Sequence, residues 1–350
     1  MPERNLFSPG TWFSHRLAWP LITLALLLAV NAVHNPNFLM LEWRNGHLYG
    51  SLIDILNRAS PLILVSLGMT LVIAMRGIDI SVGAVVAISA ATAAWMIGGS
   101  VDGDVTRWPL PVALLGALGV AGLCGLWNGV LVARIGMQPI IATLILMVAG
   151  RGIAQLITDG QIITIYYKPY FLLGGGHFLG LPVSLWIVLA VLGLLALALH
   201  RTALGVFVQA VGINPSAARL AGIRARRLVT GAYVFCGLCA GLAGLLISSN
   251  VKSADGNNAG LLMELDAILA VTLGGTSLAG GRFSLAGTFV GALIIQTLTY
   301  SIYSLGAPPE INLVVKASVV FVVMLLQSPE FRDQVWRLVW RGDPAQGARP

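Results

Sequence analysis

Four long stretches of this chain contain no charged residue and no histidine, and this pattern restricts the fold more than any other feature. A helix of about 20 apolar residues crosses the hydrocarbon core of a bilayer, and each stretch is long enough to do so. In the whole chain 57% of the residues are hydrophobic and only 10% are charged, more apolar than a soluble domain requires. The chain is therefore predicted to be an integral membrane protein. The stretches lie between Arg107 and Arg134, His177 and His200, Arg227 and Lys252, and Arg282 and Glu310.

Shorter apolar runs add further candidate spans. Because only helices and closed barrels satisfy the backbone inside a bilayer, we expect an all-α fold, a polytopic transmembrane helical bundle of about ten spans. The first run ends in Val33-His34-Asn35-Pro36 without a small-residue cleavage site, so we interpret it as a retained span and not as a signal peptide. The predicted spans are 17–33, 59–75, 83–98, 110–133, 139–157, 182–199, 228–249, 266–280, 284–304 and 311–327.

The distribution of Lys and Arg predicts the orientation, because these residues crowd the cytoplasmic loops of membrane proteins. With the N-terminus and C-terminus both in the cytoplasm, the inner segments hold 14 of the 21 Lys and Arg and the outer loops hold five. We therefore expect a cytoplasmic segment at 1–16, a transmembrane domain at 17–327 and a cytoplasmic tail at 328–350. The net charge of +7 reflects this topology and does not indicate nucleic-acid binding.

The sequence contains no recognisable catalytic motif. It lacks HExxH and GxSxG, and no predicted span has an interior histidine to act as a base. It also lacks any Gly-Lys dipeptide, which a phosphate-binding P-loop requires, so ATP hydrolysis that drives transport must occur on another polypeptide. Cys236 and Cys239 form a CxxC pair, but no second ligand pair accompanies them. We interpret them as packing residues and expect neither metal nor cofactor.

The longest predicted cytoplasmic loop, 201–227, is expected to contain two short helices. One helical piece reaches Val211, a Gly-Ile-Asn-Pro sequence interrupts it, and a second piece ends before Gly222. The loop combines an apolar face with five arginines. It either lies along the membrane surface or docks a cytoplasmic partner, and we favour docking. The candidate coupling residues are Gly212, Ile213, Asn214, Ala217, Ala218 and Gly222.

Two polar, glycine-containing segments interrupt apolar runs and predict broken helices. They are RGIDISVG at 76–83 and LGGTSLAGGRFS at 273–284. Their comparable positions indicate a weak internal repeat, as expected when a pathway forms between two similar halves, although coincidence in a glycine-rich chain would look the same. Elsewhere, glycines four residues apart predict faces where helices approach closely. Examples are Gly237 with Gly241 and Gly287 with Gly291.

Polar side chains in or beside the spans are the remaining candidates for function, because a charge at the bilayer centre costs ~2.5–3.5 kcal/mol on insertion scales unless it is paired or hydrated. Amides and hydroxyls outnumber charges, which suits a neutral, hydroxyl-rich solute better than an ion. Helix packing is the alternative for each residue, and Lys316 could simply extend to the membrane interface. The candidate pathway residues are Asp79, Asn128, Arg151, Gln155 and Gln296, with Asn257 and Asn258 of the polar outer loop 250–260.

Four blocks of sequence resemble the permease subunits of bacterial ABC importers for ribose, arabinose, xylose and galactose. They are GIDISVG at 77–83, WNGVLVARIGMQPIIATLILMVAGRG at 127–152, AVGINPSAARLAGI at 210–223 and DAILAVTLGGTSLAGGRFS at 266–284. The resemblance covers nearly the whole chain. Three further segments, DILNRASPLILVSLGMTLVIA, GRGIAQLITDGQIIT and DGNNAGLLMELDAILAV, are most similar to permeases of the galactofuranose type.

This resemblance implies a multi-pass protein of the bacterial inner membrane that imports a monosaccharide, galactofuranose or a related hexose or pentose, without catalysis of its own. It also implies three partners: an ATP-binding subunit, a periplasmic sugar-binding protein, and a second permease that in the galactofuranose type is a different chain. The block at 210–223 resembles the family's loop that contacts the ATPase. Arg76 departs from the family, which commonly has a small residue there, and we expect it to pair with Asp79.

A secondary, ion-coupled transporter of a small polar solute is the alternative function. Such a transporter would use intramembrane acids as proton or sodium sites and would need no ATPase. Uptake driven by an imposed proton gradient without ATP would distinguish it from an ABC importer.

Overall fold

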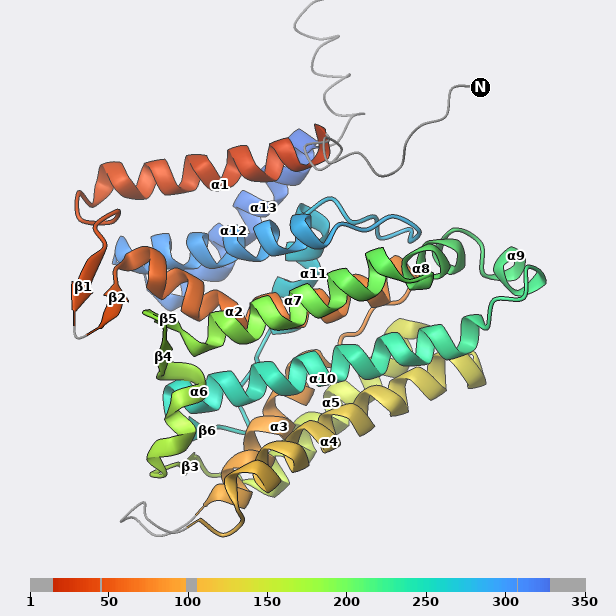
Figure 1. Ribbon diagram of the computed structural model, residues 1–350, viewed down its shortest axis with the longest axis horizontal. Coiled ribbons are helices and arrows are strands. Elements are labelled where there is room, and N and C mark those ends of the chain that lie inside the picture. The colour runs from red at the N-terminus through yellow and green to blue at the C-terminus, as the bar shows by residue number, and fades with distance from the viewer. Residues whose placement is uncertain (1–14, 45, 99–105, 307, 328–350) are drawn as a thin grey trace, which may run out of the picture.

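The computed structural model describes residues 15–44, 46–98, 106–306 and 308–327, and these are mostly helical (Figure 1). Within them, seven helical stretches are long and apolar enough to cross a membrane. The predicted helical, multi-pass class is confirmed at this level. The seven stretches are α1 (His15–His34), α2 (Ser51–Ala74), α4 (Leu110–Val130) continued by the π-helical η2 (Leu131–Ile135), α5 (Pro139–Ile157), α7 (Val183–Arg201), α10 (Ala225–Val251) and α12 (Leu285–Ser304).

A helix lies at every predicted span, but two of these helices are short. At 1.5 Å per residue, α3 (Val82–Ile97) is about 24 Å long and α11 (Met263–Leu273) about 16 Å, less than the ~30 Å of a bilayer core. Gly274 and Gly275 follow α11, so the predicted span at 266–280 is only partly helical. The last predicted span corresponds to α13 (Pro309–Gln327).

The N-terminal ends of the two short helices lie next to each other. A β-carbon added to Gly83, in the first turn of α3, would collide with the side chain of Glu264 in α11. From this point α3 extends toward short strands, since Ile97 shares a cluster with Ile165 and Ala254. Each short helix therefore covers only part of the length of the bundle.

The long helices lie side by side along the long axis of the molecule (Figure 1). Three strand pairs gather at one end, which we call the hairpin end, and two short helices lie at the other, the α8–α9 end. The strand pairs are β1 (Glu42–Arg44) with β2 (His47–Tyr49), β3 (Ile163–Thr164) with β6 (Ser253–Ala254), and β4 (His177–Phe178) with β5 (Leu181–Pro182). The remaining short elements are η3 (Lys168–Phe171), α6 (Leu172–Gly175), α8 (Leu204–Ile213) and α9 (Pro215–Leu220).

The centre of the bundle is formed by α2 and α10. In their most apolar windows 83% of α2 and 67% of α10 is buried, against 11% of α1 and 22% of the α4–η2 stretch. The outer helices expose large apolar side chains such as Leu115 and Val148, as expected of surfaces that face lipid. Polar groups in the buried parts of α2 and α10 consequently contact other helices.

Glycines allow helices to approach to backbone contact, as the four-residue spacing predicted. A β-carbon on Gly237 of α10 would lie 2.5 Å from the carbonyl oxygen of Ala121 in α4. A β-carbon on Gly291 of α12 would overlap the carbonyl oxygen of Ala270 in α11. Both faces are therefore close-packed, as expected for small residues at membrane helix interfaces.

Both predicted helix breaks are present, and they meet at the α8–α9 end. The first separates α2 from α3, and the second separates α11 from α12. The backbone amide of Gly281, in the second break, donates a hydrogen bond to the carbonyl of Ala74 at the end of α2 (2.8 Å). The two segments that the sequence compares as a repeat are thus neighbours in space.

The described helices all fall within the transmembrane domain predicted at 17–327, apart from the start of α1. Of the predicted N-terminal segment 1–16, only His15 and Arg16 belong to the described residues, where they begin α1. The predicted tail 328–350 lies outside the described residues.

Candidate functional site

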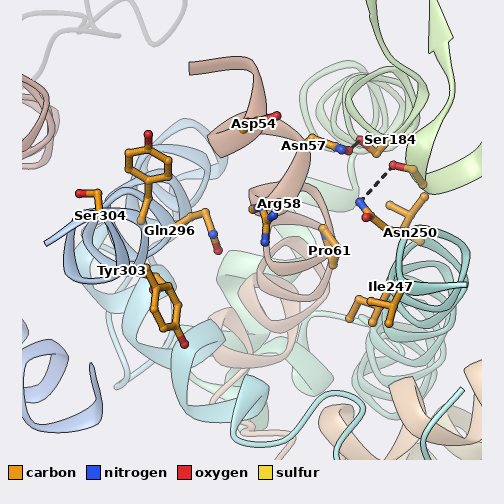
Figure 2. Close-up of a pocket in the computed structure, with 15 residues that line it drawn as sticks. Asp54, Asn57, Arg58, Pro61, Ser184, Ile247, Asn250, Gln296, Tyr303 and Ser304 are labelled. Atoms are coloured by element: carbon orange, nitrogen blue, oxygen red, sulfur yellow. Dashed lines mark hydrogen bonds between the residues drawn. The ribbon is translucent and has the colours of Figure 1, made fainter. Parts of the chain in front are cut away.

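A cavity of about 610 Å³ lies between α2, α7, α10 and α12 toward the hairpin end (Figure 2). Its walls combine apolar side chains with amides, hydroxyls and phenols. The lining residues are Asp54, Asn57, Arg58 and Pro61 of α2, Gly174 of α6, Ser184 of α7, Leu246, Ile247, Asn250 and Val251 of α10, and Gln296, Thr299, Tyr300, Tyr303 and Ser304 of α12.

The first turns of α2 supply a polar face to this cavity. Asp54, Asn57 and Arg58 are three and four residues apart, so the helix presents them on one side. Asp54 and Arg58 are exposed and Asn57 is partly buried. Figure 2 shows the guanidinium of Arg58 directed into the cavity. A charge on a membrane helix is tolerated where it is paired or faces water, and this cavity gives Arg58 a space away from lipid.

The opposite wall is a face of α12. Gln296, Tyr300 and Tyr303 follow at spacings of four and three residues and share one side of the helix. The Tyr300 hydroxyl donates to Ser51 Oγ (2.8 Å), which holds its ring in place. Gln296 is partly buried, and among the described residues its amide has no hydrogen-bond partner. The Gln296 amide is therefore available to a solute in the cavity.

Hydrogen bonds also hold the other two walls. Ser184 Oγ donates to Asn57 Oδ1 (2.5 Å), and Asn250 Nδ2 donates to the carbonyl of Gly174 (3.2 Å) (Figure 2). Each of these bonds occupies either the carbonyl oxygen or the NH₂ group of the asparagine amide, and the other group stays available. Asn57 keeps its NH₂ donors and Asn250 keeps its carbonyl acceptor for a further partner.

This cavity can exchange hydrogen bonds with a neutral solute. Amide and hydroxyl groups from four helices face an interior that also has apolar surface from Leu246 and Ile247. Apolar walls with a few convergent polar groups are typical of small-molecule sites. The two charged residues, Asp54 and Arg58, have opposite signs, so the lining does not favour an ion of either charge.

Two predicted pathway residues, Asp79 and Asn128, lie away from this cavity. Asp79 is 1% exposed and Asn128 is fully buried. The Asp79 carboxylate accepts hydrogen bonds from Ser81 Oγ (2.6 Å) and Asn128 Nδ2 (3.3 Å). Asn128 Nδ2 also donates to Ser81 Oγ (2.8 Å). This network braces the first helix break against α4.

The predicted pairing of Arg76 with Asp79 is wrong. Ser81, two residues after the acid, satisfies the carboxylate with both its hydroxyl and its amide. The Arg76 guanidinium instead donates to the carbonyls of Gly212 and Ile213 at the end of α8. The arginine thus finds its partners in a segment more than 130 residues away.

The other predicted pathway residues form an outer cluster near the hairpin end, consisting of Arg151 and Gln155 of α5 with Asn257 and Asn258. Arg151 Nη1 donates to the carbonyl of Ala259 (2.7 Å), and Gln155 Nε2 donates to Asn257 Oδ1 (2.6 Å). Asn258 Nδ2 donates to Asp255 (2.7 Å). The structure brings these four residues together but does not place them on the cavity lining.

Hydrogen bonding lowers the pKa of Asp255 in this outer loop. Burial alone would raise the pKa of Asp255. Hydrogen bonds from Asn258 and Asn257, together with the positive charge of Arg151, outweigh burial and lower this pKa. The carboxylate stays ionised and holds the turn that Arg151 contacts.

The predicted pair of short helices in the 201–227 loop is confirmed as α8 and α9, although α8 continues two residues beyond Val211. Asn214 accepts hydrogen bonds from the amides of Ser216 and Ala217 (3.0 Å each), which makes it the N-cap of α9. Ala217 is exposed, whereas Ala218 is 4% exposed and packs into the protein. The remaining candidate coupling residues differ in exposure: Ile213 and Gly222 are exposed, whereas Gly212 is buried against α2.

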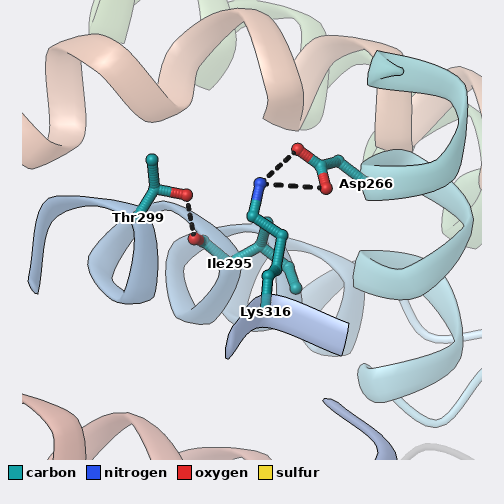
Figure 3. Close-up of polar contacts among 4 residues, drawn as sticks. All are labelled: Asp266, Ile295, Thr299 and Lys316. Atoms are coloured by element: carbon teal, nitrogen blue, oxygen red, sulfur yellow. Dashed lines mark hydrogen bonds and ion pairs between the residues drawn. The ribbon is translucent and has the colours of Figure 1, made fainter. Parts of the chain in front are cut away.

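Lys316 does not extend to the membrane interface but forms an ion pair. Its ammonium lies 2.8 Å and 3.1 Å from the two carboxylate oxygens of Asp266 (Figure 3). The Lys316 side chain is only 9% exposed and that of Asp266 is 26% exposed. The pair joins α13 to α11, next to the Thr299 turn of α12 (Figure 3).

Two of the three cysteines pack between helices in the described chain. Cys236 and Cys239 are buried and lie against Gly68 of α2. Among the described residues, no group of three or more His, Cys, Asp or Glu is placed to hold a metal ion. The cavity and the helix breaks therefore remain the candidates for function.

Comparison with known proteins identifies the kind of chain that contains this cavity. The family described as branched-chain amino acid transport system / permease component matches residues 51–325. The chain belongs to this permease family. The match begins with α2 and includes all four cavity walls and both helix breaks.

Individual relatives of the permease are sugar transport proteins. It is 51% identical to the galactofuranose transporter permease protein YtfT of Escherichia coli K12, over 90% of this chain and 92% of the relative. It is 36% identical both to the fructose import permease protein FruF of Bifidobacterium longum and to the ribose import permease protein RbsC of Escherichia coli K12. These alignments cover 91% and 88% of this chain and 90% and 92% of the relatives. No solved structure matches the chain.

These relatives confirm the resemblance to sugar-importer permeases. Because the family and its named members are permeases, this chain is a multi-pass transport subunit and not an enzyme. The wall residues of the cavity accordingly need only bind and release a solute.

Most of the cavity residues in this permease were not among the sequence candidates. Of the cavity residues, the sequence predicts Gln296 alone, because it stands by itself in a long apolar run. Asn57 and Arg58 fall just before the predicted span at 59–75, where polar residues are expected in a loop. In the structure α2 begins at Ser51, so both residues belong to the helix. The spacing of Asp54, Asn57 and Arg58 was the available signal, since these residues share one helical face.

Proposed function

We propose that this permease is the membrane-spanning subunit of an ATP-driven ABC importer that carries a monosaccharide, galactofuranose or a related hexose or pentose, across a bacterial inner membrane. Its identity to galactofuranose, fructose and ribose permeases supports this proposal. The observation that carries it is the cavity, whose walls offer neutral donors and acceptors to a hydroxyl-rich solute.

We further propose about ten spans with both termini in the cytoplasm. In this orientation the hairpin end faces the periplasm, and the α8–α9 end with its arginines faces the cytoplasm, in accordance with the positive-inside rule. Neither α3 nor α11 is long enough to cross alone. Each completes a crossing together with the non-helical segment beside it, as broken helices do in other transporters.

Three partners complete the importer. The ATP-binding subunit docks on α8 and α9, where Leu220 is 91% exposed and Val206 and Ile213 are also exposed. The periplasmic sugar-binding protein docks at the hairpin end, and a second permease, a different chain, completes the pathway. ATP binding moves α8 and α9 and switches the cavity between outward-facing and inward-facing states.

The candidate pathway residues take three roles in this proposal. Gln296 contacts the sugar, since its amide faces the cavity without a protein partner in the described chain. Asp79 and Asn128 act at a distance by bracing the first helix break. The outer cluster holds the loop that the sugar passes as it enters. A solute that meets amides and hydroxyls can exchange hydrogen bonds without being held tightly.

Cysteine accessibility tests whether the cavity is the pathway. In a background with the three native cysteines replaced by alanine, Gln296→Cys should react with a small water-soluble thiol reagent, and uptake should slow on modification. Asn128→Cys is the matched control, because Asn128 is also an amide in an apolar helix but is fully buried. Equal reactivity at both positions, or no reactivity at Gln296→Cys in any state of the cycle, would refute the assignment.

The energy source distinguishes this function from ion-coupled transport. Proteoliposomes with the complete complex should accumulate sugar only when ATP is supplied to the cytoplasmic side. Uptake driven by a proton or sodium gradient without ATP would favour a secondary transporter.

A further inference from the structure

Arg76 has a backbone conformation that is unusual for its residue type. Its φ is 64°, in the left-handed region that favours glycine. It follows Met75 directly at the end of α2, where the chain turns into the first helix break. A residue held in such a conformation is often kept there by a specific interaction that offsets the strain, so the contacts of its side chain are informative.

The side chain of Arg76 binds the C-terminal end of α8. Nε donates to the carbonyl of Gly212 (2.6 Å), and Nη2 donates to the carbonyl of Ile213 (2.5 Å). These are the last two residues of α8, whose carbonyls have no partner within the helix. The C-terminal end of a helix carries partial negative charge, so a cation there is favourable, and charge-assisted hydrogen bonds are the stronger kind.

The second helix break packs into the same junction. The amide of Gly281 donates to the carbonyl of Ala74 (2.8 Å). A β-carbon on Gly280 would lie 2.6 Å from Cγ of Arg76, and one on Gly212 would overlap the carbonyl oxygen of Ala74. Three segments thus touch through backbone atoms and one arginine: the end of α2, the end of α8 and residues 280–281. The hydrogen bonds of Arg76 join α8 to the end of α2, and that of Gly281 joins the end of α2 to the second break.

These three segments connect the proposed ATPase docking helices to the cavity. At its other end, α2 carries Asn57 and Arg58 on one cavity wall. The second break leads into α12, which carries Gln296 on the opposite wall. A displacement of α8 therefore has a contiguous path of contacts to both walls. The guanidinium is the element of this path that a substitution can remove to test the coupling.

We propose that Arg76 is a positioning residue that couples α8 to both walls of the cavity. It fastens the end of α8 to the two helix breaks, so that a movement imposed on α8 and α9 reaches α2 and α12 together. This proposal rests on the proposed function, in which an ATPase docks on α8 and α9. Without the guanidinium, α8 can move while the cavity does not follow, so ATP hydrolysis continues without import.

The test compares Arg76→Gly with the wild type in the complete complex in proteoliposomes, measuring ATP hydrolysis and sugar uptake together. Glycine removes the guanidinium and also suits the left-handed backbone, so folding should be preserved. Sugar imported per ATP hydrolysed should fall by about fivefold or more, in the range of ordinary coupling effects. Arg76→Lys should recover part of the ratio, because lysine keeps the charge without the planar fork. Arg134→Ala, which removes an exposed arginine of η2, the segment that continues α4, should leave the ratio unchanged.

A second measurement does not depend on assembly of the complex. In the full-length permease in nanodiscs, Arg76→Gly should increase hydrogen exchange of the α8 amides at 210–213, whereas Arg134→Ala should not. An unchanged ratio of sugar to ATP in Arg76→Gly, or unchanged exchange at 210–213, would overturn the proposal. A wild-type complex that imports no sugar with ATP would overturn the proposed function instead, and the exchange result would still stand on its own.

Discussion

The ion pair between Lys316 and Asp266 predicts a large and strongly non-additive effect on stability. Lys316→Met keeps an unbranched chain of similar length but removes the ammonium, so Asp266 loses both of its contacts at 2.8 Å and 3.1 Å. Removing one partner of a fully buried pair costs about 3–5 kcal/mol, because the other charge stays buried without compensation. Asp266 retains 26% exposure, so some of its charge remains hydrated. We therefore expect a loss of about 2–3 kcal/mol in the free energy of unfolding.

A double-mutant cycle measures this interaction directly. The free energy of unfolding of the permease in micelles is measured by SDS titration for Lys316→Met, Asp266→Asn and the double variant. Each single variant leaves one charge in a low-dielectric setting, whereas the double variant leaves none. The double variant should therefore lose less than about 1 kcal/mol, which corresponds to a coupling of about 2 kcal/mol or more. If the unfolding free energies lost in the two single variants simply add in the double variant, the ion pair contributes no coupling energy and the reasoning is wrong.

Three further predictions concern other parts of the molecule. Ala217→Glu adds bulk and charge to an exposed position of α9, so the ATP-binding subunit should no longer co-purify with the permease. Ala217→Ser should retain the subunit. A normal yield of the subunit with Ala217→Glu would exclude α9 from the docking surface. Gly291→Ala should lower the free energy of unfolding by about 1–3 kcal/mol, because the added β-carbon overlaps the carbonyl oxygen of Ala270. Gly193→Ala is the control, because its β-carbon meets open space. Equal free energies of unfolding for the two variants would contradict the close packing. Burial and charge repulsion from His47, whose ring stacks on that of His177, lower the pKa of His177, against the opposing charge of Asp54. The folded state thus favours the neutral ring, and stability at the hairpin end should fall as the pH drops through the ordinary value of 6.5. The protection factor of the Leu48 amide, which bonds to Gly180, should fall in acid in the wild type but not in His177→Gln.

Much of the fold follows from local sequence because each helix is encoded within its own residues. Apolar runs of helix length predict α1, α4 and α7, and a Gly-Ile-Asn-Pro sequence predicts the turn between α8 and α9. The broken helices were also predicted, since polar glycine-rich segments within apolar runs are local signals. Where a glycine pair followed, as after α11, the helix ended earlier than hydropathy alone indicates.

The site was less predictable because its residues come together only in the tertiary structure. The cavity draws on α2, α7, α10 and α12, and Asn57 and Asn250 are separated by almost two hundred residues. Charge alone suggested that Arg76 would pair with the nearby Asp79, but the turn at Arg76 and the presence of α8 give the guanidinium other partners. Asn128 and Gln296 are both amides in apolar runs, yet one is fully enclosed and the other lines a cavity. Composition cannot distinguish these two environments.

The contact between α4 and α10 limits how this molecule can change shape. Gly125 and Gly237 bring backbone against backbone, with Tyr233 and Ala121 contributing carbonyl oxygens. At an interface of leucines, side chains can change rotamer to accommodate a small shift of the helices. Backbone atoms have no rotamers, so the contact between α4 and α10 cannot adjust in this way. The two helices must either travel as one piece or come apart entirely. Because α10 also lines the cavity, a movement of this wall would carry α4 with it.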